Sequence, residues 1–553
     1  MVSSVDRWLR PAAMALLGAG LVCWLVDAGL VGMWLFTLSA VAWALALPFP
    51  YALVSPLYMG LAGWLVDMLP FVVLAGWAAV IGRWAWGLFR ERRLPRGGRW
   101  IWLPIGLVVW TLVGLTALDL SELKHFTLLL AIQVLINGTV LAVVDQLEDL
   151  EQRTTVVAGL LGFVVVLAAG VFLQWVGVPI EPLQDETVGA RAEAAYGVDA
   201  FPNDTGMIKY ARAENGGAYE LSQKLKGVAK KAPELPAHRV ILAPTSAFDG
   251  GKLLVRFEGS ARRAEQDLAK ADVQLIYDNV GIAPANTVPR LRSFPRNALT
   301  FAGIAAALFP LAFFLAWSDD RRRRLLGRVA IAACLFAAGF SIARGAWAVI
   351  LIGGIYLLID GVLPWGKKLQ YLGAFAAAAL VLTAVFVLKY DSDPLNARAG
   401  GESSVETRAE VYGATVQKLD ARHLLTGFGM TLSRTTDSTS YGQLGQYVPP
   451  AGTHSTYLNY LFRTGIPGAL GIIALYVLAV AHSRAAARGL TGARRVLATL
   501  GAAAVIIAAA HALILSLYVE PIYSLAISLV LGLGMAHGRL PQSIIPWRKT
   551  AAA

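Results

Sequence analysis

The sequence predicts an all-α polytopic membrane protein, and three observations support that fold class. Of the 553 residues, 57% are hydrophobic and only 15% are charged, whereas soluble domains carry about 25% charged residues. Apolar runs long enough to cross a bilayer, such as Val156 to Val178 and Leu369 to Leu388, recur along the whole chain. Basic residues collect in the short stretches between these runs. A soluble protein of this length has no core large enough to bury so many apolar runs.

The net charge of +12 comes from basic residues in the short loops between the apolar runs. We therefore predict no nucleic-acid partner. In the longest polar stretch, residues 178–297, acidic and basic residues nearly balance. An excess of Lys and Arg in short loops is typical of the cytoplasmic side of a membrane protein. The loops concerned contain Arg90, Arg92, Arg93, Arg96 and Arg99; Arg321 to Arg324 with Arg328; Lys367 and Lys368; and Arg484, Arg488, Arg494 and Arg495.

With these loops inside, the chain is predicted to cross the membrane twelve to fourteen times, with both termini in the cytoplasm. The stretch 29–89 is the least regular, because Asp27, Pro48, Pro50 and Asp67 interrupt it or its flank. If the number of crossings is below fourteen, we expect either that two spans in this stretch merge or that one of them is re-entrant. The basic N-terminus leads into a first helix that we expect to be retained. The predicted spans are 10–27, 29–48, 51–66, 69–89, 100–118, 127–146, 156–177, 298–317, 326–343, 346–363, 369–389, 455–483, 495–517 and 521–538.

The sequence divides into N-terminal transmembrane helices (1–177), a periplasmic α/β module (178–297), transmembrane helices (298–389), a periplasmic loop (390–454) and C-terminal transmembrane helices (455–553). Strand-like runs in the module are 239–242, 252–258 and 273–277, and helix-like stretches lie near 206–231 and 261–271. In the loop, Ser403 to Glu406 fits a capping box that opens an amphipathic helix ending near Ala421. Gly427-Phe-Gly429 follows.

His454 is a candidate catalytic residue, because it stands where the long loop enters a membrane helix. An imidazole titrates close to neutral pH and can take a proton from a hydroxyl group. The alternative is a histidine that caps the helix or lies at the membrane interface. Gly465 and Gly468, three residues apart further along, fit close helix packing.

Arginines on the predicted outer side are candidate ligands for an anion, since they oppose the usual charge bias. Arg344 lies in a predicted turn, where a guanidinium can bind a diphosphate in a bidentate manner; the alternative is an arginine extending to the interface beside Trp347. Arg290, Arg292 and Arg296 precede a helix, and their alternative role is ion pairing with the acidic residues of the module.

The remaining polar residues and the absence of known motifs limit the kinds of reaction that the sequence supports. Arg408 lies on the amphipathic helix, where a solvated face is the simplest interpretation, and Glu520 and His511 fit packing or interfacial roles. The sequence has no phosphate-binding loop, dinucleotide fingerprint or zinc-protease motif in a suitable context. Cys23 and Cys334 lie far apart in apolar segments. We therefore predict neither a metal nor a cofactor.

Four motifs between about residues 288 and 470 resemble the O-antigen ligase family in order. His454-Ser455, nine residues, Gly465, two residues and Gly468 fit the family's His-[Asn/Ser/Gln]-x9-Gly-x2-[Gly/Thr/Tyr] pattern. Ser341 to Trp347 is similar to its Ser-Arg-Gly-x-Trp turn, with Ala343 in place of the usual serine. Val288 to Leu299 and Arg408 to Gly429 are similar to two further motifs, although Arg290 and Arg292 compete for one family position.

The resemblance implies a GT-C-like glycosyltransferase of the bacterial inner membrane that acts at the periplasmic face. It would move a glycan from undecaprenyl diphosphate to an acceptor hydroxyl on a glycan or glycolipid such as lipid A-core, without a metal ion. Arg344 with Arg290 or Arg292 would hold the diphosphate, with Arg408 nearby, and His454 would orient or deprotonate the acceptor. Membrane lipids would surround the donor's tail.

Four other functions remain open at this point: a polymerase or an O-linking oligosaccharyltransferase of the same family, a transporter of lipid-linked glycans, and a non-catalytic scaffold whose α/β module recruits partners. A polymerase of the same family would add repeat units to a lipid-linked chain, and it shares the same architecture. A transporter of lipid-linked glycans belongs to a different class, which typically shows paired repeats and broken helices near the bilayer midplane. The two halves of this sequence do not resemble each other, which favours an enzyme.

Overall fold

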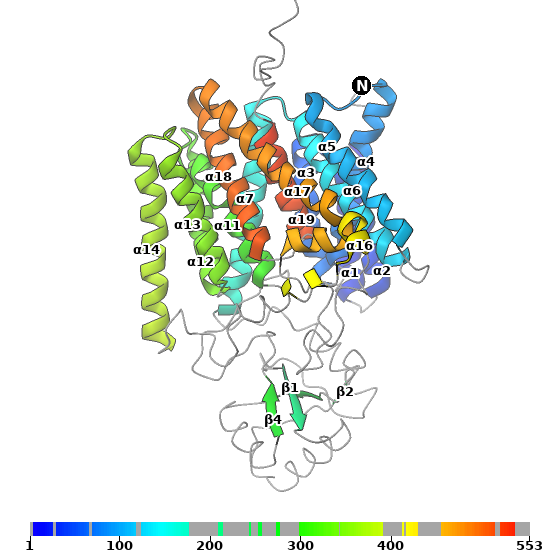
Figure 1. Ribbon diagram of the computed structural model, residues 1–553, viewed down its shortest axis with the longest axis horizontal. Helices are drawn as coiled ribbons and strands as arrows, with labels where there is room; N and C mark the ends of the chain where they lie inside the picture. The colour runs from blue at the N-terminus through cyan, green and yellow to red at the C-terminus, as the bar shows by residue number, and fades with distance from the viewer. Residues whose placement is uncertain are drawn as a thin grey trace, which may run out of the picture.

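Fourteen helices of twelve or more residues make up most of the described chain in the computed structural model (Figure 1). The structure describes residues 4–25, 29–65, 69–117, 123–175, 298–341, 343–390, 412–413, 416–417, 419–429, 455–514 and 520–536, together with four short strands between 208 and 276.

The helices are as follows: α1 (Ser4–Leu25), α2 (Gly29–Ala46), α3 (Phe49–Leu65), α4 (Leu69–Glu91), α5 (Trp102–Val113), α6 (Leu123–Gln146), α7 (Leu150–Trp175), α11 (Ala298–Ala316), α12 (Arg321–Phe340), α13 (Arg344–Ile359), α14 (Trp365–Tyr390), α17 (Thr456–Gly489), α18 (Gly492–Ile514) and α19 (Pro521–Met535). Shorter elements are the 3-10 helices η1 (Gly98–Ile101) and η2 (Gly114–Ala117) and the helix α16 (Ala421–Thr426).

The all-helical polytopic fold is confirmed. Each predicted span overlaps one of these helices, and the irregular stretch 29–89 contains the three separate helices α2, α3 and α4. Pro50 lies in the first turn of α3, where a proline costs no hydrogen bond. Among the described residues, six helices are long and apolar enough to cross a membrane, and seven further apolar helices are shorter. The number of crossings and the five-part division of the chain stay predictions.

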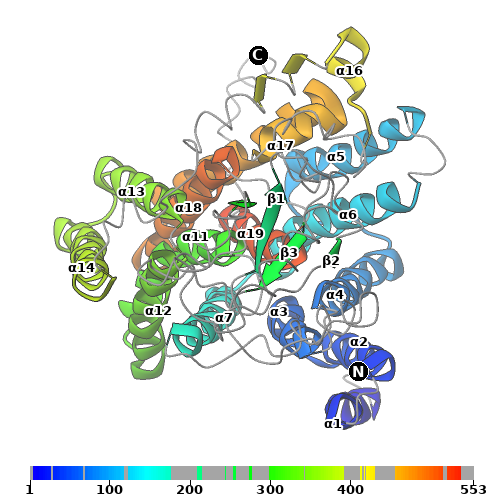
Figure 2. The ribbon, with the colours of Figure 1, turned by 90° about the horizontal axis from the view of Figure 1, so that it is seen from below.

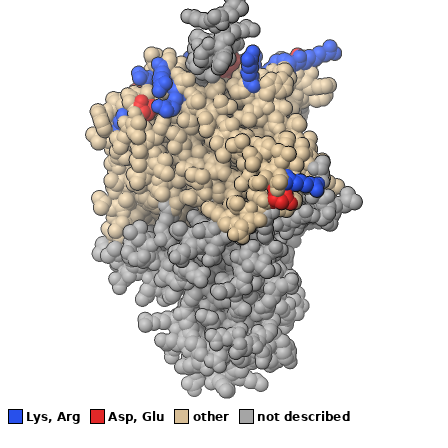
Figure 3. Space-filling view, in the orientation of Figure 1, with Lys and Arg blue, Asp and Glu red and all other residues tan. Residues whose placement is uncertain are grey.

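The basic loops gather at one end of the bundle, which we call the basic end. Lys368 Nζ donates to the carbonyl of Leu358 over 2.9 Å, and Arg323 forms an ion pair with Glu151 at the start of α7. In the orientation of Figure 3, Lys and Arg side chains cluster on the upper face of the bundle. The opposite end, here called the outer end, is where α7, α14 and α18 finish and where α11, α13, α17 and α19 begin.

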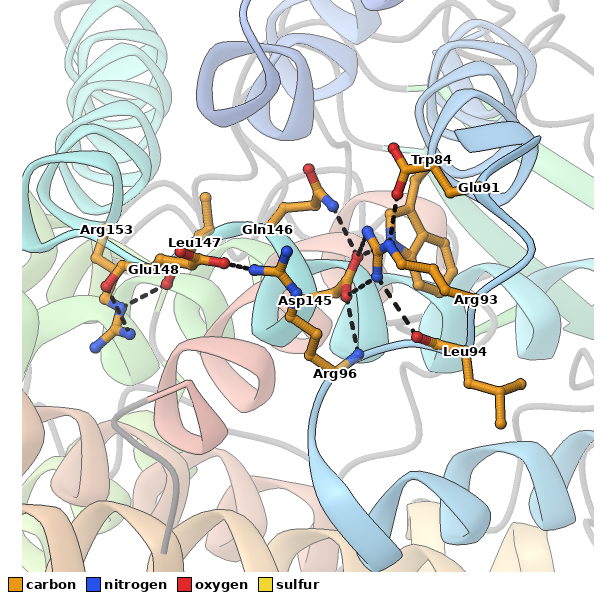
Figure 4. A network of polar contacts seen from close by, with 10 residues as sticks. All are labelled: Trp84, Glu91, Arg93, Leu94, Arg96, Asp145, Gln146, Leu147, Glu148 and Arg153. Carbon is orange, nitrogen blue, oxygen red and sulfur yellow. Dashed lines mark hydrogen bonds and ion pairs between the residues drawn. The ribbon is translucent and has the colours of Figure 1, made fainter. Parts of the chain in front are cut away.

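A buried carboxylate holds part of the basic end together. Asp145 on α6 accepts hydrogen bonds from Arg93 Nη1 at 2.6 Å, Trp84 Nε1 at 3.0 Å and the backbone amide of Arg96 at 2.9 Å (Figure 4). Its side chain is 0% exposed. The hydrogen bonds that Arg93 donates to Asp145 and to Glu91 raise the pKa of Arg93 above its ordinary value. Arg93 is therefore a structural residue in addition to its predicted part in the charge bias of the loops.

The centre of the bundle is formed by α11 and α19, which the other helices surround (Figure 2). Every residue of α19 is buried, as are Phe301 to Leu315 of α11. The outermost helix in Figure 2 on the opposite side from α1 is α14. Apolar burial of this extent is the packing expected when helices are hydrophobic all round.

The module between α7 and α11 contains a four-stranded antiparallel sheet in the order β2-β3-β1-β4. Its strands are β1 (Ile208–Ala213), β2 (Ala243–Pro244), β3 (Leu253–Arg256) and β4 (Val273–Ile276). In Figure 1 these strands lie below the bundle, away from the basic end.

Two of the predicted strands, at 252–258 and 273–277, are confirmed as β3 and β4. The predicted helix near 206–231 is wrong at its start, because Ile208–Ala213 forms β1. Tyr210 pairs with Leu254 on one side and Ile276 on the other, so pairing of a central strand overrides the helix propensity of Ala, Lys and Arg. The predicted strand 239–242 and the helix 261–271 lie outside the described residues, and the helical part of the module is not shown.

Candidate functional site

Helix α17 begins at the outer end directly after His454. Ser455 is its N-cap residue, and its side chain accepts a hydrogen bond from the amide of Leu458. Ten residues later the helix is interrupted at Gly465, which has φ 68° and ψ −172°. Residues 456–464 therefore form an outer segment of α17 that is distinct from the rest of the helix.

The interruption leaves three backbone carbonyls without their normal helical partners. Pro467 has no amide hydrogen, so it cannot donate to the carbonyl of Arg463 four residues earlier. The amide of Phe428 donates to the carbonyl of Phe462 over 2.8 Å, and that of Gly429 donates to Arg463 over 3.0 Å. The indole of Trp110, on α5, donates to the carbonyl of Thr464 over 2.8 Å. Two other segments thus pair the three carbonyls at the helix break.

We call residues 420–429 the outer clamp, because they hold the break in α17. Asp420 caps α16 by accepting from the amide of His423 over 2.8 Å, and this hydrogen bond lowers the pKa of the Asp420 carboxyl. The predicted amphipathic helix therefore does not run on to Ala421, where a new helix starts. The ring of His423 stacks on Phe428, with centroids 3.8 Å apart, and Phe428 stacks on Phe462 at 4.5 Å.

Two glycines make this contact possible. Gly427 has φ 70°, and a Cβ there would overlap the backbone of Arg463 and Thr464. A Cβ on Gly465 would overlap the carbonyl of Leu425. The expectation that Gly465 allows close contact with another helix is confirmed, since Leu424 and Leu425 lie in α16; the same glycine also breaks α17. A Cβ on Gly468 would meet Thr464 in the preceding turn of its own helix.

The outer segment of α17 carries buried polar side chains inside an otherwise apolar bundle. Asn459 and Arg463 are both 0% exposed. The hydroxyl of Tyr460 donates to Gln133 Oε1, on α6, over 2.7 Å. Among the described residues, Gln133 Nε2 and Asn137 Oδ1 are buried and have no hydrogen-bond partner. Buried polar groups of this kind are costly in a membrane, so this polar interior marks the outer half of the bundle as the candidate functional region.

The turn between α12 and α13 is held by its own side chains. Ser341 Oγ donates to the carbonyl of Ala338 over 2.9 Å, and Trp347 Nε1 donates to the same carbonyl over 3.1 Å. Arg344 is the first residue of α13, and the N-cap residue Ala343 makes no side-chain capping bond. A Cβ on Gly345 would meet Ile514 at the end of α18, so this turn packs against the outer end of α18.

The outer ends of α17, α18 and α19 are also joined. The hydroxyl of Tyr457 donates to the carbonyl of Ala509 over 3.0 Å. His511 Nδ1 lies 3.0 Å from the hydroxyl of Tyr523. His511 is therefore a buried packing residue with a polar partner, as the sequence indicates. Glu520 is the N-cap residue of α19 and makes no side-chain capping bond.

The structure leaves most of the predicted site residues untested. His454, Arg290, Arg292, Arg296 and Arg408 lie outside the described residues, and so does the side chain of Arg344. The described segments that adjoin them, namely the starts of α11, α13 and α17, all lie at the outer end. Within the described part of the chain, no group of three His, Cys, Asp or Glu residues could hold a metal ion.

Sequence reasoning missed the buried Arg463, the Gln133–Tyr460 pair and the pairing of the clamp with α17. The sequence does carry a signal for Arg463 and for the break in α17. Arg463 is the one Lys or Arg in the apolar stretch 456–483, and an arginine inside a membrane helix is by itself a functional indication. Gly465 followed by Pro467 marks a helix break. The partner of the break is not readable from local sequence.

The fold and the buried polar outer segment define a multi-span helical membrane protein. A family model described as O-Antigen ligase matches residues 329–473, and this match confirms the resemblance to the O-antigen ligase and polymerase family. The matched region includes Arg344, Arg408, the outer clamp and the break at Gly465, but not Arg290 or Arg292. No curated protein matches the chain.

Proposed function

We propose that the protein transfers a glycan from undecaprenyl diphosphate to an acceptor hydroxyl, as an O-antigen ligase does, at the periplasmic face of the inner membrane. The observation that carries this proposal is the common position of two segments within the matched region. Helix α13, which begins at Arg344, and α17, which begins just after His454, both start at the outer end of the bundle. The basic loops lie at the opposite end, which the positive-inside rule assigns to the cytoplasm.

At the anomeric carbon of the donor sugar, the proposed reaction forms one C–O bond and breaks one. The acceptor hydroxyl oxygen attacks the anomeric carbon of the donor sugar, and the bond from that carbon to the diphosphate oxygen breaks. The electron pair leaves with undecaprenyl diphosphate, while the hydroxyl proton passes to His454 as general base. Arg344, with Arg290 or Arg292 and Arg408, would stabilise the negative charge that builds on the leaving diphosphate. This assignment needs no metal ion or cofactor.

The outer clamp supports these roles. The long loop 390–454 ends at His454, and its residues 420–429 are hydrogen-bonded to the first turns of the helix that His454 precedes. These hydrogen bonds join the middle of the loop to the end of the outer segment of α17, next to the break. Such a contact would keep the loop over the site and fix the entry of the chain into α17.

Deletion of the gene, followed by measurement of the glycan that remains on undecaprenyl diphosphate, tests the proposal. Long polymer on the carrier, with none on the mature acceptor, is the result expected for a ligase. Single repeat units on the carrier would instead indicate a polymerase of the same family. If no lipid-linked glycan accumulates on the periplasmic side, the transferase assignment is wrong and transport becomes the better explanation.

A further inference from the structure

A cavity of about 670 Å³ opens at the basic end, far along the helices from the proposed transfer site. It lies between the starts of α7, α12, α14 and α18 and the end of α11. Its inner wall is apolar, formed by Leu150, Phe314, Leu315 and Val496. Its rim carries both acidic and basic side chains, whereas a groove that faces only lipid tails is apolar throughout.

Part of the rim charge is already neutralised within the protein. Arg323 pairs with Glu151, and its backbone amide donates to Asp320 Oδ1 over 2.8 Å. Two charges remain. Within the described chain, the carboxylate of Asp319 has no ion pair, and neither does the ammonium group of Lys367, which lies 4.8 Å from the ring centroid of Trp317. The rim therefore offers the carboxylate of Asp319 and the ammonium group of Lys367 to a ligand, while the carboxylate of Asp320 accepts from the backbone at the start of α12.

The start of α18 adds to the positive side of the cavity. Gly492 and Ala493, its first two residues, line the cavity. The first amides of a helix have no intrahelical acceptors and favour an anion. Lys367 and these amides together suit a phosphate group, whereas Asp319 suits an ammonium group.

We propose that this cavity binds the headgroup of a zwitterionic aminophospholipid of the phosphatidylethanolamine class. The ammonium group binds Asp319, the phosphate binds Lys367 and the start of α18, and the acyl chains lie against the apolar wall. A membrane lipid is the occupant because the cavity combines that wall with Trp317 at the ends of apolar helices, the level at which aromatic residues meet lipid headgroups. This inference does not depend on the transfer reaction.

Native mass spectrometry of the delipidated full-length protein in detergent tests the proposal, with 1-palmitoyl-2-oleoyl phosphatidylethanolamine or the matching phosphatidylglycerol added back. We expect preferential binding of the ethanolamine lipid, and a loss of about tenfold in its affinity in Asp319→Asn and in Lys367→Gln, because each removes one charge-assisted contact. Asp319→Glu, which keeps the carboxylate, should retain the preference. Equal binding of both lipids, or unchanged binding in both neutral variants, would overturn the proposal.

Two controls make the outcome specific. Asp420→Asn and Arg90→Gln remove one charge of each sign away from the cavity, and both should bind the ethanolamine lipid as the unmodified protein does. Soluble O-phosphoethanolamine separates the two sources of the same chemistry. It should compete only weakly, since it lacks acyl chains. Competition as strong as that of the lipid would show a site for a soluble ligand and would contradict a lipid site.

Discussion

Gly427 and Gly465 interlock at the outer end of the bundle, although they lie far apart in sequence. Both have φ near +70°, and a Cβ on either would overlap the backbone of the segment that carries the other. Phe428 and Gly429, next to the first glycine, donate to the carbonyls that the break at the second leaves open. The long loop and the break in α17 are therefore one structural unit.

The break itself gives the first prediction. Gly465→Ala places a side chain at a left-handed backbone position and against Leu425, so it should displace the clamp and lower stability by about 1–3 kcal/mol. Thermal unfolding of the purified protein, followed by tryptophan fluorescence, measures the effect. Gly373→Ala is the matched control, because a Cβ there meets nothing within 4 Å and alanine favours the helix. Equal stability of Gly465→Ala and the control would contradict the interlock.

Pro467 tests the pairing of the clamp separately from the glycines. Pro467→Ala supplies an amide that can compete for the carbonyl of Arg463, which now accepts from Gly429. We expect the amides of residues 419–429 to exchange hydrogen on the order of tenfold faster, equivalent to the loss of one net hydrogen bond. Hydrogen–deuterium exchange with mass spectrometry measures this. Unchanged exchange in that peptide would show that the missing proline amide is not what recruits the clamp.

The polar interior predicts a compensating pair of substitutions. Tyr460→Phe removes the donor to Gln133 Oε1 and leaves a buried acceptor unpaired, which should cost about 1–3 kcal/mol. Adding Gln133→Leu should restore much of the loss, since replacing both partners of a buried hydrogen bond by apolar groups is close to neutral. A double-mutant cycle by thermal unfolding measures the coupling. Strictly additive losses would contradict the pair.

Asp145 gives a prediction at the basic end. Removal of its charge in Asp145→Asn weakens the buried hydrogen bonds from Arg93, which keeps its ion pair with Glu91, and should destabilise the protein by about 1–3 kcal/mol. Asp420→Asn, an exposed carboxylate whose amide replacement can still cap a helix, should cost far less. The midpoints of thermal unfolding of the two variants compare them directly. A loss in Asp145→Asn no larger than that in Asp420→Asn would show that the network of Figure 4 contributes little.

The sequence predicts the helices well because hydrophobic length and loop charge are local properties. It also predicts β3 and β4, which are short runs rich in Leu, Val and Ile. It fails at Ile208–Ala213, since strand pairing with distant segments decides that structure. The contact between Phe428 and Phe462 is equally non-local. Counting helices along the sequence predicts which residues lie at the outer end. The depth and the partners of Gln133 depend instead on how the helices pack.

The most direct test of the proposed function is complementation of a gene deletion by His454→Ala and Arg344→Ala, at membrane levels matched to the unmodified protein. The amounts of glycan on undecaprenyl diphosphate and on the acceptor are measured together, with Gly373→Ala as the control. We expect transfer to fall by about 100-fold or more in both variants, with the glycan retained on the lipid carrier, and to remain normal in the control. Normal transfer by both variants would contradict a transferase site at the outer end.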